Sequence, residues 1–225
     1  MSTPGTPSPS PLAVGGFAAF ALSIPLAGAF NPDYSHVREG ISALAATDSP
    51  AAPIMIAGFL ALALGTAAAG VALWVRLPVG VAGRIGAVLV VLAGLGMVVV
   101  GLNQQDCSEL IGACAAAEAA GTLSDHHVVH QLASLAVFLV LVIAMFPLAR
   151  GLRRNGGPAG VAVATRLVGV VGLLVIAAMV TGDLGDLGGV VQRLFIALLF
   201  GAPVALTGWS RIRRAVTGTP VGRSR

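Results

Sequence analysis

Six long apolar runs, separated by shorter polar stretches, set the pattern of this chain. Each run is close to the roughly 20 apolar residues that a helix needs to cross the hydrocarbon core of a bilayer. The pattern therefore predicts an all-α fold, a polytopic membrane helix bundle with six transmembrane helices. The predicted spans are residues 12–30, 53–75, 84–102, 128–148, 166–181 and 190–209.

Composition supports lipid as the main solvent of this chain. The 225 residues are 56% hydrophobic and only 10% charged, whereas a soluble domain averages about 25% charged residues. Such a chain cannot cover itself with polar surface. We therefore expect one domain, residues 12–210, whose helices pack against one another and against membrane lipids.

The two ends of the chain lie outside the apolar pattern. Residues 1–11 are almost all Ser, Thr, Pro and Gly, which predicts a disordered tail, and residues 211–225 form a basic tail. A cleaved signal peptide is the competing interpretation of the first run, because Ala27-Gly28-Ala29 resembles a cleavage site. The preceding stretch lacks the positive charge that a signal peptide needs, so an uncleaved helix is favoured.

The distribution of arginine predicts the orientation in the membrane. Eleven of the 13 basic residues, and none of the nine acids, lie in the tails and around residues 76–84 and 150–166. By the positive-inside rule this side is cytoplasmic. We expect a multi-pass plasma-membrane protein with both termini cytoplasmic. The net charge of +4 then reports topology, and no nucleic-acid partner is expected.

A polar stretch, residues 31–52, follows the first predicted span. Within it Val37, Ile41, Leu44 and Ala45 recur at helical spacing. This stripe predicts a short helix that lies on the membrane surface and buries its apolar side there.

The segment from Asp106 to His130 is the most polar part of the chain. Its cysteines, Cys107 and Cys114, share one outer loop on the oxidising side of the membrane, where thiols tend to pair. We predict a disulfide. Thiolate ligation of a metal and a free pair are the alternatives, although the spacing matches no common zinc site.

A histidine pair opens the fourth predicted span. A helix that begins near Asp125, with Ser124 as its N-cap, places His126 and His130 one turn apart on one face. Together with Asp106 this pair would suit a metal such as zinc, or one imidazole would act as a base that the other orients. The alternative is a set of interfacial histidines solvated by headgroups, with His127 expected to face water.

Charged residues near the last span are the candidates for ligand binding, namely Arg193, Asp183 and Arg38. Arg193 lies three residues into the sixth span at its outer end, where a charge is costly. It either extends outward to water or faces inward, towards Asp183, Asp186, Asp106 or an anionic group of a ligand. Gln192 is expected to point elsewhere.

Ser42 is a weak candidate for a nucleophile. It lies in the first outer loop, near the charged residues of that loop. It lacks the G-x-S-x-G context in which a serine is held on a sharp turn between a strand and a helix.

The outer segments carry a set of short motifs: Asn31-Pro32-Asp33-Tyr34-Ser35, Arg38, Ile41-Ser42-Ala43-Leu44, Pro50, Asp106-Cys107, His126-x3-His130 and Gln192-Arg193. With these motifs the chain resembles, over residues 12–210, a bacterial membrane protein family called domain of unknown function 998. It implies a small six-helix membrane protein and carries no assigned reaction. The H-x3-H element is also similar to one motif of the alkaline-ceramidase and adiponectin-receptor-like hydrolases. Those proteins have seven helices and place the pair in the last one.

Three functions are compatible with these patterns, and whether the protein is an enzyme stays open. The first is an accessory or binding protein that recognises a lipid headgroup or a small anionic ligand through an outward-facing site of His, Asp and Arg. The second is a metal-dependent membrane hydrolase that uses His126, His130 and Asp106, with zinc as its cofactor. A transporter ranks last, because no ionisable residue lies at mid-span. The patterns predict no oligomeric state.

Overall fold

The structure is a computed structural model that describes residues 10–76, 80–108, 112–181 and 185–217, without the side chains of residues 76 and 209–217. The described residues form six long helices: α1 (Pro11–Ala29), α2 (Ala52–Arg76), α3 (Gly80–Leu102), α5 (Asp125–Arg154), α6 (Ala159–Thr181) and α7 (Gly188–Thr217). Three short elements join them: η1 (Ile41–Ala45), α4 (Gly112–Ala119) and η2 (Gly185–Leu187). Six helices are long and apolar enough to cross a membrane, which confirms the predicted fold class.

Most of the long helices extend beyond the predicted spans. α3 begins at Gly80, α5 continues to Arg154 and α6 begins at Ala159, whereas the apolar runs covered residues 84–102, 128–148 and 166–181. Hydropathy marks only the part of a helix that lies in lipid, so polar turns at its ends are not detected. α7 likewise continues through Thr217, into the predicted basic tail. Residues 1–9 of the predicted disordered tail lie outside the described residues.

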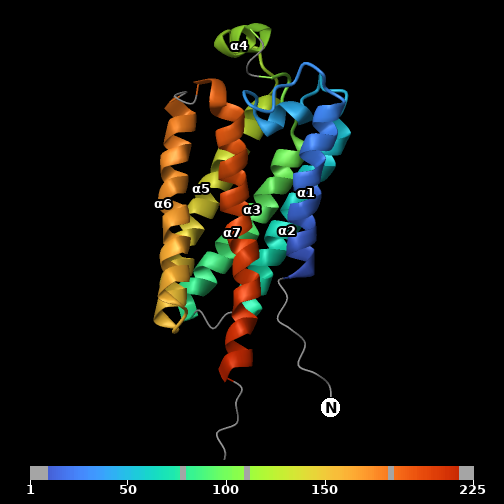
Figure 1. Cartoon of the computed structure of the whole chain (residues 1–225). Coiled ribbons are helices and arrows are strands. Elements are labelled where there is room, and N and C mark those ends of the chain that lie inside the picture. The colour runs from blue at the N-terminus through green and yellow to red at the C-terminus, as the bar shows by residue number, and fades with distance from the viewer. Residues whose placement is uncertain (1–9, 77–79, 109–111, 182–184, 218–225) are drawn as a thin grey trace, which may run out of the picture.

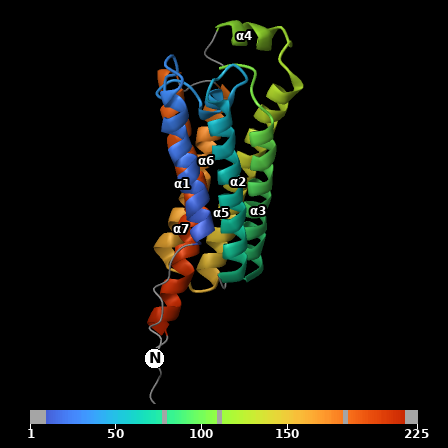
Figure 2. The same cartoon turned by 90° about the vertical axis from the view of Figure 1, so that its right-hand side faces the viewer.

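The six helices stand side by side in an up-and-down bundle (Figures 1 and 2). Neighbours in sequence pack together, from α1 through α2, α3, α5 and α6 to α7, and α7 closes the bundle against α2. α4 lies at one end, which we call the upper end (Figure 1). The end of α2, the start of α3 and the connection from α5 to α6 lie at the lower end, together with the start of α1 and the end of α7.

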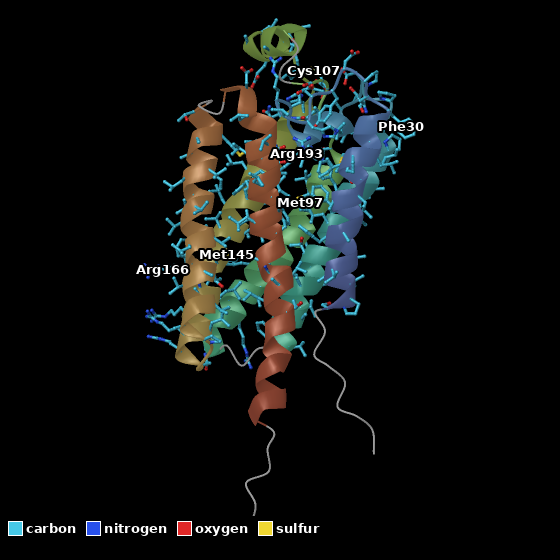
Figure 3. The ribbon with its side chains drawn as sticks, viewed as in Figure 1. Phe30, Met97, Cys107, Met145, Arg166 and Arg193 are labelled. Carbon is cyan, nitrogen blue, oxygen red and sulfur yellow. A yellow bond between two sulfur atoms is a disulfide. The ribbon has the colours of Figure 1, made fainter. Side chains whose placement is uncertain are left out.

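Charge is segregated between the two ends. Figure 3 shows Cys107 and Arg193 towards the upper end and Arg166 towards the lower end. The described acids are all in the upper loops, in the short elements α4 and η2 of that end, or in the first turn of α5. The described arginines are instead mainly at the lower helix ends: Arg84, Arg150, Arg153, Arg154 and Arg166.

The first upper loop, residues 30–51 between α1 and α2, folds back onto the bundle. Its helical part is the 3-10 turn η1, in which Ile41, Leu44 and Ala45 are buried. η1 packs against α1, α2 and α7, while Val37 is 48% exposed. The predicted helix on the membrane surface is therefore wrong, because the apolar stripe covers the top of the protein core instead of lipid.

Candidate functional site

The guanidinium of Arg193 fastens the first upper loop to α7. Its Nη1 donates to the carbonyls of Glu39, at 2.9 Å, and Gly189, at 2.8 Å. Its Nη2 donates to the hydroxyl of Tyr34 and lies 3.3 Å from Nδ1 of His36. The guanidinium carbon is 5.7 Å from the centre of the Tyr34 ring, within the range of a cation–π contact. The side chain thus faces the protein.

Arg193 forms no ion pair with Asp106 or Asp186, the two described carboxylates among its candidate partners. Among the described residues its hydrogen bonds go to carbonyls, a hydroxyl and an imidazole. Asp186 pairs with Arg38 at 3.3 Å instead, between side chains that are 88% and 58% exposed. Such an exposed pair contributes little to stability. Asp183, the remaining candidate for ligand binding, lies outside the described residues.

The start of α7 is capped by the same loop. The amides of Gly189 and Val190 donate to carbonyls of the loop, each at 3.1 Å, which satisfies two helix donors that have no partner within the helix. Oε1 of Gln192 accepts from the amide of Ile41 at 2.6 Å. Gln192 and its neighbour Arg193 therefore hold one loop between them, and the expectation that Gln192 points elsewhere is wrong.

His130 is buried beneath η1, with 2% of its surface exposed. Its Nδ1 lies 2.7 Å from the carbonyl oxygen of Asn103 and 3.0 Å from that of Val100. Its Nε2 lies 2.8 Å from Oγ of Ser42. Since carbonyl oxygens only accept, Nδ1 carries the ring proton and Nε2 accepts the hydrogen bond of the Ser42 hydroxyl.

The second upper loop connects α3 to α5 and contains α4. Asp106 and Ser124 join this loop to the start of α5. Oγ of Ser124 accepts from the amide of His127 at 3.2 Å, which confirms the predicted N-cap. The Asp106 carboxylate accepts from the hydroxyl of Ser124 at 2.6 Å and from its amide at 2.7 Å. These two hydrogen bonds stabilise the charged carboxylate and lower the pKa of Asp106.

His127 faces the protein and His126 faces out. His127 is fully buried, its Nδ1 accepts from the amide of Asp106 at 3.1 Å, and its Nε2 lies 3.0 Å from the Gln131 carboxamide. His126 is exposed. The expectation that His127 faces water is wrong, because the face of α5 that packs inward carries residues three apart, His127 and His130.

The predicted zinc ligands do not come together. His126 is exposed, whereas both ring nitrogens of His130 are engaged by Ser42 and by carbonyls at the end of α3. The Asp106 carboxylate is bound by Ser124. In the part of the chain that the structure describes, no group of three or more His, Cys, Asp or Glu is placed to hold a metal. These residues therefore do not fit the predicted metal site.

The disulfide between Cys107 and Cys114 is formed, as predicted. It joins the start of the second upper loop to α4, in which Cys114 is 3% exposed. The bond closes a short loop directly after Asp106, so it constrains the segment that carries this carboxylate.

A pocket of about 500 Å³ opens in the first upper loop. Its charged lining consists of three carboxylates and one guanidinium, from Asp33, Glu39, Asp48 and Arg38. The carboxylate of Glu39 accepts from the amide of Ser35 at 2.8 Å and from the hydroxyl of Ser108. The pocket thus carries an excess of negative charge.

The sequence patterns assign no role to Tyr34 or Gln192, two of the side chains that build this end of the bundle. They indicate Ser42 only as a weak candidate for a nucleophile. The proximity of these residues arises from contacts between distant segments, such as the 88 residues between Ser42 and His130. The spacing of His127 and His130 was the one local signal, because residues three apart also share a helix face.

One family model matches the chain. It is described as "Protein of unknown function (DUF998)" and covers residues 13–210. The matched range includes all six long helices up to the last turns of α7, and both upper loops. No curated protein matches the chain, and no solved structure matches it.

Proposed function

This chain belongs to the DUF998 family of membrane proteins, and on that premise we propose that it binds the headgroup of an amine-bearing lipid at its outer face. The observation that carries the proposal is the pocket of about 500 Å³ in the first upper loop, with its excess of carboxylates. The sequence patterns also suggested a lipid headgroup as the ligand. The proposal differs in that the recognised group is a positively charged amine instead of an anion.

The orientation follows from the arginines. The lower end of the bundle carries the described arginines of the α2–α3 and α5–α6 connections, and the upper end carries the acids. The positive-inside rule then puts the lower end, and with it both termini, in the cytoplasm of a plasma-membrane protein. The pocket opens at the outer face on this assignment.

The charge of the lining selects the ligand class. Asp33, Glu39 and Asp48 outnumber Arg38, whose Nε already lies 3.3 Å from the Asp186 carboxylate. A small anionic ligand would be repelled by three carboxylates, whereas an ammonium group would be attracted. A zwitterionic phosphoethanolamine headgroup has an ammonium for the carboxylates and a phosphate for Arg38.

The position of the pocket favours a lipid over a free amine. Its lining includes Asn31, two residues after the end of α1, and Pro50, two residues before the start of α2. Both helices are long and apolar enough to cross the bilayer. The pocket therefore lies at the headgroup level, where lipids are present at high local concentration.

The proposal predicts selective retention of phosphatidylethanolamine. We expect native mass spectrometry of the protein from mixed bilayers to show phosphatidylethanolamine bound in preference to phosphatidylglycerol. The double variant Asp33→Asn, Asp48→Asn should lose most of this preference, because it removes two of the carboxylates that attract the ammonium.

Glu118→Gln is the matched control, because Glu118 is an exposed acid on α4 that does not line the pocket. It should retain phosphatidylethanolamine like the unmodified protein. Equal retention of the two lipids by the unmodified protein, or an unchanged preference in the double variant, would contradict the proposal.

A further inference from the structure

Ser42 and His130 form a pair that the headgroup pocket does not use. Oγ of Ser42 and Nε2 of His130 are 2.8 Å apart, within the reach needed for proton transfer. We propose that Ser42 is a nucleophile, that His130 is its general base, and that the pair acts on an acyl ester of a membrane lipid. The inference goes beyond lipid binding and concerns different residues, so either proposal can fail without the other.

The tautomer of His130 suits the role of a base. Its Nδ1–H is directed at the carbonyls of Asn103 and Val100, at 2.7 and 3.0 Å. These acceptors fix the orientation of the ring, as a carboxylate does in a Ser-His-Asp triad. The lone pair on Nε2 is thereby presented to the serine hydroxyl.

Two hydrogen bonds hold the backbone directly before Ser42 in place. The amide of Ile41 donates to Gln192 at 2.6 Å, and the carbonyl of Gly40 accepts from the hydroxyl of Tyr34 at 2.9 Å. Ser42 itself is only partly buried. Its hydroxyl is therefore fixed relative to His130, and the residue is still accessible.

A small cavity lies against Ser42. It has a volume of about 40 Å³, enough for a water molecule, and its polar lining consists of Ser42, Ser134 and Gln192. Oε1 of Gln192 is committed to the Ile41 amide, which leaves the NH2 group of the same carboxamide as a donor. We assign it the role of stabilising the oxyanion that develops on a substrate carbonyl.

The depth of the pair in the membrane indicates the substrate class. His130 contacts Val100 and Asn103, at the upper end of the membrane-spanning helix α3. This level is the boundary between hydrocarbon and headgroups, where the ester carbonyls of phospholipids lie. The rest of the cavity lining is apolar, with Phe20, Phe59 and Phe138 among its residues.

The proposed reaction is hydrolysis of an acyl ester through an acyl-serine. The Ser42 hydroxyl gives its proton to His130 Nε2 as Oγ bonds to the ester carbonyl carbon, and the resulting oxyanion collapses as the bond to the alkoxy oxygen breaks. The leaving alcohol takes the proton from His130. Water then attacks the acyl-serine, with His130 accepting its proton and returning it to Ser42 Oγ, so that a fatty acid is released.

The direct test is labelling with an alkyl fluorophosphonate, which phosphonylates an activated serine and releases fluoride. We expect stoichiometric modification of Ser42 in the purified protein, located by mass mapping, and none at this position in Ser42→Ala. Replacing His130 by glutamine should slow the labelling by about 100-fold, the scale of general-base assistance. His126→Gln, on the exposed side of the same helix, is the matched control and should label at the original rate.

The pH profile of the unmodified protein tests the base without any substitution. The labelling rate should rise with pH and then reach a plateau, because only a neutral imidazole has a lone pair at Nε2 that can accept the serine proton. A serine that reacts without assistance reacts through its alkoxide, so its labelling rate would keep rising with pH and reach no plateau. Absence of the adduct at Ser42, or equal labelling rates with glutamine and histidine at position 130, would overturn the proposal.

Discussion

Replacing Arg193 by glutamine is expected to destabilise the protein by about 3 kcal/mol, the range for losing hydrogen bonds to a charged donor and leaving their acceptors unpaired. The guanidinium donates to the carbonyls of Glu39 and Gly189 and to the hydroxyl of Tyr34. Glutamine is too short to reach all three. Equilibrium unfolding in mixed micelles, followed by circular dichroism, measures the free energy of unfolding.

Arg38→Gln is the matched control for this prediction. Arg38 is also an arginine of the upper end, but its ion pair with Asp186 is exposed and should contribute less than about 1 kcal/mol. An equal loss of unfolding free energy in the two variants would contradict the prediction, because it would show that the hydrogen bonds of Arg193 add nothing beyond its charge. A large loss for Arg193→Gln alone is the expected result.

Adding a single methyl group at Gly16 is expected to be almost as costly. An ideal Cβ at this position would lie 2.4 Å from the carbonyl oxygen of Ala61 and 2.7 Å from Cα of Gly65. These are backbone atoms of α2, so relief requires α1 and α2 to move apart. We expect Gly16→Ala to destabilise the protein by about 1–3 kcal/mol, the usual cost of overpacking.

Gly15→Ala controls for the intrinsic effect of alanine in the same helix. Apart from the backbone of its own helix turn and its two chain neighbours, no described atom lies within 4 Å of an ideal Cβ at Gly15. Alanine should there be neutral or slightly stabilising, because it favours the helix over glycine. Equal unfolding free energies for the two variants would mean that α1 does not pack on α2 as closely as described.

The apolar pattern predicted the six helices because the lipid requirement acts on each helix separately. A span such as α3 is recognisable from its own residues, whatever its neighbours are. The same independence explains why the boundaries were less well predicted. The ends of α5 and α6 extend beyond the apolar runs and are fixed by capping, as with Ser124, and by turns rather than by lipid.

The candidate site was predicted only in its general location. Both the polar segment from Asp106 to His130 and the position of Arg193 are at the upper end, and the disulfide is formed. The hydrogen-bond partners within the site were not predicted. His126 and His127 are neighbours in sequence but point to different faces of α5, and the sequence pattern did not show which face packs inward. The same holds for Ser42, which meets His130 only when the first upper loop folds onto the bundle.

The charge of the pocket is a second property that sequence patterns did not reveal. Arg38 and Arg193 suggested an anionic ligand when read as isolated residues. In the fold, the guanidinium of Arg193 donates its hydrogen bonds to backbone carbonyls. Arg38 shares the pocket with three carboxylates, from Asp33, Glu39 and Asp48. Electrostatic selectivity depends on which charges share one space, and that is set by the tertiary structure.

The upper end of the bundle, with its pocket and its Ser42–His130 pair, is expected to face the outside of the cell. Both native cysteines are joined in a disulfide, so a cysteine introduced in their presence provides a single reactive thiol. The most direct test is labelling of Thr122→Cys, at the upper end, and Pro158→Cys, in the α5–α6 connection, with a membrane-impermeant maleimide. We expect Thr122→Cys to be labelled in intact cells and Pro158→Cys only after permeabilisation. Labelling of Pro158→Cys in intact cells, with protection of Thr122→Cys, would contradict the account.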